Sequence, residues 1–192
     1  MRRDLHFSPS LYQVGLGVGL VSLSAFFIGL ILAFAFRIET QPGKIQFHAP
    51  TSLWLSTVLL AVSSWLLEAA RYALRRALIA IYRGRVLAAM ILGFVFLALQ
   101  VSAGLNLFEQ GVMTVANPQG SAFYIFMGVH GAHILGGLGW LLFLFIRSAA
   151  LFSGSENDLR KHRLIAGAAA SYWHYMGLVW AVLFFFLLQW SR

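Results

Sequence analysis

Long apolar runs alternate with short polar segments along the whole chain. We place the runs at about 14–36, 51–70, 86–107, 121–146 and 164–190. A helix of about 20 apolar residues crosses the hydrocarbon core of a bilayer, which is about 30 Å thick. The pattern therefore predicts an all-α, polytopic membrane protein: a bundle of five transmembrane helices that forms a single membrane domain over residues 1–192.

The composition supports a membrane protein and excludes several kinds of site. The chain is 60% hydrophobic and 10% charged, whereas soluble domains carry about 25% charged residues. It contains no cysteine, which excludes disulfides, thiolate metal sites and iron–sulfur clusters. No hydrolase triad, zinc-helix motif, P-loop or dinucleotide fingerprint is present.

The positive charges predict how the helices cross the membrane. Most of the 14 Lys and Arg residues lie in the N-terminus, between the second and third runs, and between the fourth and fifth runs. Only Arg37, Lys44 and Arg192 lie on the other side. Since cytoplasmic loops carry the excess of Lys and Arg, we expect a cytoplasmic N-terminus and an external C-terminus. The first run is too long for a cleaved signal peptide.

The fourth run combines small residues with two histidines. Gly128, Ala132 and Gly136 recur every four residues and so share one helix face, which allows close approach of a second helix. His130 and His133 are three residues apart on roughly one side of the helix. Polar side chains at bilayer depth usually face protein, so this helix is expected to pack within a bundle.

The fifth run carries a polar and aromatic cluster that includes Tyr172, Trp173 and His174. At 1.5 Å per residue, His174 lies roughly 15 Å and His133 roughly 20 Å from the cytoplasmic ends of their helices. Sequential antiparallel helices usually touch. The two histidines are therefore expected to be able to meet near the middle of the bundle.

The histidines allow three interpretations: haem or metal ligands, a path for protons or substrate, or hydrogen-bonded packing between helices. Packing is favoured because buried polar groups usually need only a partner. A path is disfavoured because none of the 6 carboxylates lies in the middle of a run. Glu68 lies near a helix end, where we expect an interfacial ion pair with Arg71 or Arg75, worth less than about 1 kcal/mol if exposed.

Four short motifs occur in the chain and are specific when taken together. They are NP with FYxxxGxHGxHxxGG within 117–137, YWHY with VW within 172–180, TxLLxxSS within 57–64, and LGxxFLxxQ within 92–100. These motifs resemble those of subunit III of the haem–copper oxidases, the cytochrome c and quinol oxidases of respiratory chains. Five helices resemble the short bacterial form of that family.

The resemblance implies an accessory role in a proton-pumping terminal oxidase of aerobic respiration. Subunit III of that family has no haem, copper or catalytic centre, and it supports the stability and proton uptake of subunit I. The implied partners are oxidase subunits I and II, with subunit IV as a further candidate, and membrane phospholipid. The implied location is the inner membrane of a bacterium. Gly128, His130, Ala132, His133, Gly136, Tyr172, Trp173 and His174 are then expected to serve packing between helices or subunits.

The chain departs from the family pattern at three acidic positions. Many members have a carboxylate after the serine that matches Ser24, where this chain has Ala25. Gly167 and Gly177 stand where acids often flank the histidine that matches His174. These losses place a proton-handling role in doubt. The alternatives are an accessory subunit of a nitric oxide reductase, a small cytochrome with its own bis-histidine haem, and a stand-alone transporter.

Overall fold

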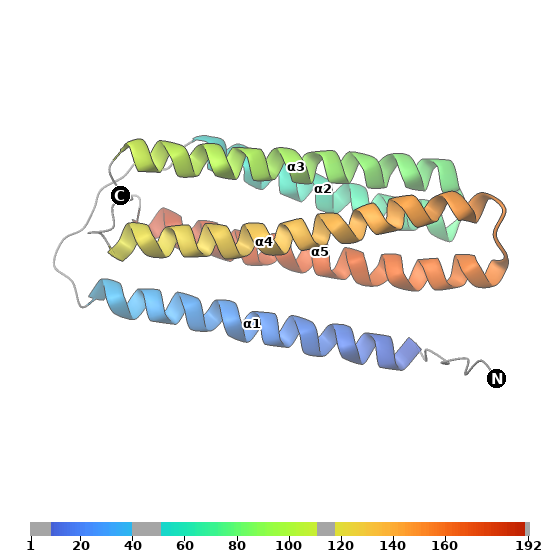
Figure 1. The fold of residues 1–192 in the computed structure, drawn as a ribbon, viewed down its shortest axis with the longest axis horizontal. Coiled ribbons are helices and arrows are strands. Elements are labelled where there is room, and N and C mark those ends of the chain that lie inside the picture. Colours follow the sequence, from blue (N-terminus) through green and yellow to red (C-terminus); the bar gives the residue numbers. More distant parts are fainter. Residues whose placement is uncertain (1–8, 40–50, 111–117, 191–192) are drawn as a thin grey trace.

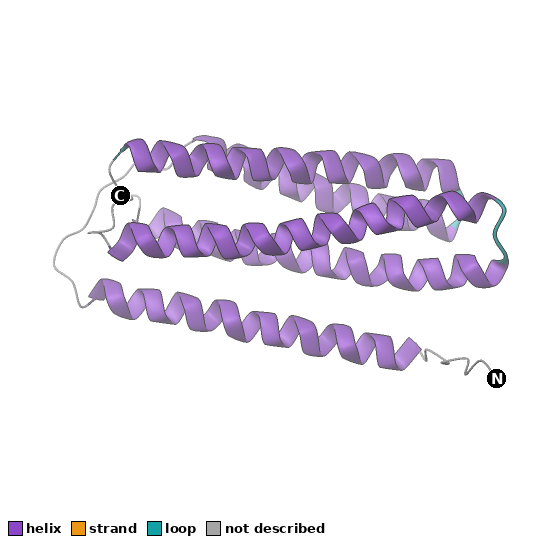
Figure 2. Cartoon of the chain, viewed as in Figure 1, coloured by secondary structure: helices purple, strands orange, loops and turns teal. Residues whose placement is uncertain are grey.

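The computed structural model shows five long α-helices and describes residues 9–39, 51–110 and 118–190. The helices are α1 (Pro9–Glu39), α2 (Thr51–Arg75), α3 (Ile79–Glu109), α4 (Pro118–Arg147) and α5 (Glu156–Trp190), with a short 3-10 helix, η1 (Ser148–Phe152), after α4. Within these ranges the structure contains helices and no strand (Figure 2). Each helix is long and apolar enough to cross a membrane. The predicted fold class is confirmed. Asn117, Lys44 and both chain ends lie outside the described residues.

Three helices continue beyond the predicted runs at their arginine-rich ends. The last carbonyl groups of a helix have no partner within it and need an outside donor. Arg163 of α5 donates to the carbonyl oxygens of Leu74 at 3.2 Å and of Arg75 at 3.0 Å, and so caps α2. Arg85 of α3 donates to the carbonyl oxygen of Ala69. Hydropathy marks only the part of a helix inside the bilayer, so the apolar runs do not include these polar turns, although the spacing of Glu68, Arg71 and Arg75 indicates a helix that continues past the second run.

Helices α2, α3, α4 and α5 form one bundle, and α1 lies along one side of it (Figure 1). α2 and α3 make an antiparallel hairpin, whose tight turn includes Ala77 at a φ of 56°. α5 packs against α2 and α4, and α3 packs against α4. α1 contacts α4 and α5 alone among the described helices.

The core runs along the inside of the four-helix bundle. Its largest fully buried side chains include aromatic residues from α3 and α5, namely Tyr82, Phe96, Trp173 and Trp180. α1 adds one buried ring, that of Phe27. Large rings on some helices require small residues on the facing ones, because interiors pack with few voids.

Candidate functional site

Trp173 lies at the centre of the bundle and fills the space left by two glycines. A Cβ atom on Gly93 of α3 would stand 2.9 Å from the Trp173 ring, and one on Gly137 of α4 would stand 3.0 Å from it. The indole Nε1 donates to the Ser63 hydroxyl of α2 at 3.1 Å, and that hydroxyl donates to the Ala89 carbonyl oxygen at 3.0 Å. Trp173 therefore joins four helices.

His130 is enclosed by aromatic rings. The side chain is 1% exposed and stacks on Trp180 at 5.6 Å between ring centroids. The rings of Phe27 and Phe96 approach its edges at 6.2 and 6.1 Å. Neither imidazole nitrogen has a hydrogen-bond partner among the described residues. His130 thus contributes to the contact between α1, α3, α4 and α5 through its ring faces and edges.

His133 lies about one turn further along α4 and shares one neighbour, the ring of Phe27, with His130. Its Nδ1 donates to the Val129 carbonyl oxygen of its own helix at 2.7 Å, and its ring lies 5.6 Å from that of Phe27. Tyr172 of α5 donates its hydroxyl to the His133 carbonyl oxygen at 2.9 Å. This part of α4 is therefore tied to both α1 and α5.

His174 faces α2 instead of α4. A hydrogen bond of 3.1 Å joins its Nδ1 to Ser64 Oγ, and its Nε2 lies 3.6 Å from Glu68 Oε2. No hydrogen bond or ring contact joins His174 to His133 within the described ranges. The structure thus does not bring these two side chains together as the sequence analysis expected.

Glu68 forms an ion pair of 2.7 Å with Arg71, one turn away on α2. Arg75 forms no ion pair with any described residue, and its carbonyl oxygen accepts the hydrogen bond from Arg163. The pair is partly exposed, with 49% of the Glu68 side chain accessible, so its direct contribution to stability is small, less than about 1 kcal/mol.

The small residues of α4 lie on the outside of the chain. Gly128, Ala132 and Gly136 are exposed. A Cβ on Gly128 would meet nothing within 4 Å, and one on Gly136 would meet only the Tyr172 hydroxyl at 4.0 Å. The glycines that receive a side chain, Gly93 and Gly137, were not singled out as packing positions in the sequence. The signal for them was present, since both belong to the motifs at 92–100 and 117–137.

The arrangement does not fit a bis-histidine haem. Such a site needs two imidazoles that face each other across the bundle. Here His130 and His133 lie on the same helix and share Phe27 as a neighbour, whereas His174 contacts Ser64 and Glu68 of α2. The described part of the chain has no group of three or more His, Cys, Asp or Glu residues that could hold a metal ion.

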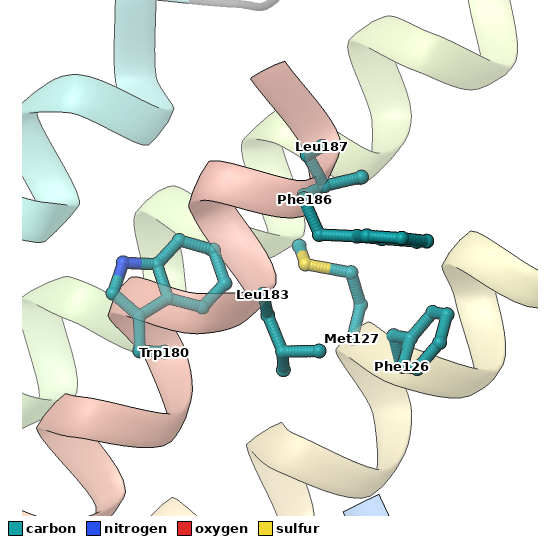
Figure 3. Close-up of a pocket in the computed structure, with 6 residues that line it drawn as sticks. All are labelled: Phe126, Met127, Trp180, Leu183, Phe186 and Leu187. Carbon is teal, nitrogen blue, oxygen red and sulfur yellow. The ribbon is translucent and has the colours of Figure 1, made fainter. Parts of the chain in front are cut away.

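A small cavity between α4 and α5 also leaves no room for a large ligand (Figure 3). Its volume is about 10 Å³, the space of about one water molecule. Its lining is entirely apolar and consists of Phe126, Met127, Trp180, Leu183, Phe186 and Leu187. This cavity is a packing gap.

Comparisons with known proteins identify similar chains. The family model described as cytochrome c oxidase subunit III matches residues 12–192. The probable cytochrome c oxidase subunit 3 of Mycobacterium tuberculosis is 30% identical over 181 residues, covering 92% of this chain and 86% of that protein. The cytochrome c oxidase subunit 3 of Synechocystis is 30% identical over 188 residues, covering 93% and 76%. A probable quinol oxidase subunit 3 of Staphylococcus haemolyticus is 27% identical over 138 residues, covering 72% and 66%.

Proposed function

This chain belongs to the cytochrome c oxidase subunit III family and is a subunit III of a haem–copper oxidase, in which we propose that it is an accessory subunit with no redox centre of its own. The observation that carries the proposal is the placement of the three histidines. His130 and His133 both contact Phe27 of α1, whereas His174 contacts Ser64 and Glu68 of α2. Such contacts hold helices together and do not assemble a pair of ligands.

Subunit III implies a complex with other oxidase subunits. We propose that subunit I is the direct partner, with subunit II as a second partner and subunit IV as a further candidate. The outer face of α4 supports this. Gly128, Ala132 and Gly136 leave a shallow stripe along an exposed helix surface. Small residues let helix backbones approach closely in a membrane, where packing between helices drives association. This stripe is the proposed contact with a helix of subunit I.

The proposed accessory role is to stabilise subunit I and to support its proton uptake. The proposed setting is the inner membrane of a bacterium, with the N-terminus cytoplasmic and the C-terminus periplasmic. The basic residues of the α2–α3 turn and of the connection from α4 to α5 lie at one end of the bundle (Figure 1), which supports this orientation. Phospholipid is proposed to cover exposed apolar side chains such as Val58, Leu105 and Phe185.

The test is to fill the stripe with a large side chain and to measure the association with subunit I. Gly128→Leu places a large side chain where this chain has open space, so the helix bundle is expected to fold while less subunit I co-purifies with the tagged chain. The matched control is Gly84→Leu on α3, where a Cβ also meets nothing within 4 Å. Equal recovery of subunit I with both variants and the wild type would contradict the proposed contact.

A further inference from the structure

Four polar side chains form a continuous row along the seam between α2 and α5, which we call the polar row. Arg71 Nη1 lies 2.7 Å from Glu68 Oε2. The same carboxylate oxygen lies 3.6 Å from His174 Nε2. The opposite nitrogen of that ring, Nδ1, is hydrogen-bonded to Ser64 Oγ at 3.1 Å. Each member of the row therefore lies next to another polar group.

The polar row leads from the basic end of the bundle to its middle. Ser64 lies one residue past the midpoint of α2, Thr51–Arg75. His174 lies one residue past the midpoint of α5, Glu156–Trp190. The row then runs toward the C-terminus of α2 over about 10 Å, at 1.5 Å per residue from Ser64 to Arg71. It therefore connects the basic end of the bundle to a histidine at mid-depth.

Two glycines of α5 lie beside the polar row. A Cβ on Gly177 would lie 3.7 Å from Ser64 Oγ, and one on Gly167 would lie 3.9 Å from Arg71 Nη2. Both glycines lie within a turn or two of His174 on the same helix. α5 thus presents small residues to the polar groups of α2, and the carboxylate of this seam comes from α2.

The groups of the polar row are also accessible from outside the chain. The side chains of Glu68 and His174 are 49% and 38% exposed. Ionisable groups inside a membrane are costly and generally mark ion or proton pathways or pair with partner groups. A buried structural ion pair would be enclosed by its own helices. Because Glu68 and His174 are partly exposed, this pair can instead exchange protons with water or with a subunit that covers the seam.

We propose that Glu68 and His174 form an intramembrane proton-holding site on the outer seam of α2 and α5. The inference rests on the proposed function, because the proton would serve the oxidase to which this chain belongs. Imidazole is the side chain best suited to exchanging protons near neutral pH. Nε2 of His174 and Oε2 of Glu68 lie 3.6 Å apart, just beyond hydrogen-bond distance, so a protonated imidazole would face the carboxylate directly.

The exchange is a proton transfer without change of oxidation state. When Nε2 of His174 takes up a proton from a hydronium ion, an O–H bond of that ion breaks, an N–H bond forms at Nε2 and a water molecule leaves. The carboxylate of Glu68 stays paired with Arg71 and faces the imidazolium, which keeps its Nδ1 bond to Ser64. The charged groups that face the site are Arg71 and Glu68 from α2 and His174 from α5, and the contacts described for α3 and α4 bring no other charge to it.

The experiment uses the whole oxidase complex, purified through a tag on this chain and reconstituted into vesicles. Proton uptake during turnover is measured on the side of the basic loops for Glu68→Gln, His174→Gln and the double variant. The control is Glu109→Gln, which removes an exposed carboxylate at the far end of α3. We expect the two single variants to slow proton uptake by the same factor, the double variant to be no slower, and the control to match the wild type.

A second measurement tests the site without relying on turnover. Infrared difference spectra between acid and alkaline samples of the complex, with isotope-labelled histidine, should contain an imidazole signal that His174→Gln removes and Glu68→Gln alters. A rate of proton uptake in Glu68→Gln equal to that of the wild type would overturn the proposal. A double variant slowed by the product of the two single factors would also overturn it, because the two residues would then act independently. Detachment of the Glu68→Gln chain from the haem-bearing subunits would make the pair a docking contact and also overturn it. If the wild-type chain brings down no such subunits, the proposed function itself fails.

Discussion

Two sets of glycines in this bundle have opposite surroundings. Gly93 and Gly137 face Trp173 so closely that an added Cβ would stand 2.8 to 3.2 Å from its neighbours. Gly128 and Gly139, on the same helix as Gly137, would meet nothing within 4 Å. α4 therefore uses glycine on its inner face to admit a tryptophan of its own chain and on its outer face to keep a surface open. The same residue type indicates a core contact in one case and a site for external contact in the other.

The comparison extends to whole helices. Residues buried inside the chain make up 33–39% of the spans of α2 to α5 but only 11% of the span of α1. α1 is held by the buried ring of Phe27 and by a hydrogen bond of 2.6 Å between the hydroxyls of Ser24 and Tyr175. Gly15, Gly17 and Gly19 of α1 have open space around them. The four-helix core is thus self-contained, whereas α1 and the outer face of α4 leave much of their surface to other molecules.

Removing the ring at the centre of the core should have the largest effect on the fold. Trp173→Ala deletes a side chain that joins four helices, and large-to-small changes of this kind cost about 3–5 kcal/mol in well-packed cores. We expect a clear fall in the midpoint of thermal unfolding of the detergent-purified complex, followed by circular dichroism. Trp65→Ala is the control, because Trp65 on α2 is 69% exposed. Equal losses for the two variants would show that Trp173 has no special place in the core.

Replacing a glycine that faces Trp173 by alanine should also lower the thermal stability, but by less. In Gly93→Ala the new methyl group would lie 2.8 Å from Leu138 Cδ2 and 2.9 Å from Trp173 Cη2. Overpacking of this kind costs about 1–3 kcal/mol. Gly104→Ala on the same helix has nothing within 4 Å of its Cβ and should leave stability unchanged or slightly raised, since alanine favours helix. The midpoint of thermal unfolding is measured for both variants. Equal midpoints for Gly93→Ala and Gly104→Ala would refute the difference between buried and exposed glycines.

Removing the hydrogen bond that holds α1 against α5 should have the smallest effect on the unfolding free energy. Tyr175→Phe removes the hydroxyl that bonds to Ser24, and hydrogen bonds between membrane helices average about 0.6 kcal/mol. A double-mutant cycle with Ser24→Ala isolates this pair, and the coupling is read from the unfolding free energy. Tyr72→Phe, at an exposed position of α2, serves as the control. A coupling energy of zero would mean that the hydroxyl contact does not hold α1.

Hydropathy predicts the five helices because each must satisfy its backbone hydrogen bonds across the bilayer. It does not predict where the helices end, since the last turns of α2 and the first turns of α5 are polar and are held by contacts such as that of Arg163 with Leu74. Spacing alone also leaves the rotation of each helix open. His130 and His133 are three residues apart, yet the first is enclosed by rings while the second is only partly buried.

The candidate site shows the same limit. The cluster at Tyr172, Trp173 and His174 can be found from sequence because polar and aromatic groups stand out in an apolar run. Its partners cannot, because they lie on another helix, α2: Ser63 for Trp173 and Ser64 for His174. Glu68 looks remote from mid-membrane when only its position on α2 is counted. Its long side chain reaches back toward the middle of α5, and only the three-dimensional packing shows this.

The most direct test of the central claim is a reduced-minus-oxidised visible spectrum of this chain, recorded before and after its partners are stripped away. The chain is purified in mild detergent through its own tag. We predict that larger subunits with haem and copper co-purify and that the stripped chain is colourless. A haem band that stays with the stripped chain would mean that its histidines are ligands, and it would contradict the assignment of this chain as a subunit without a redox centre.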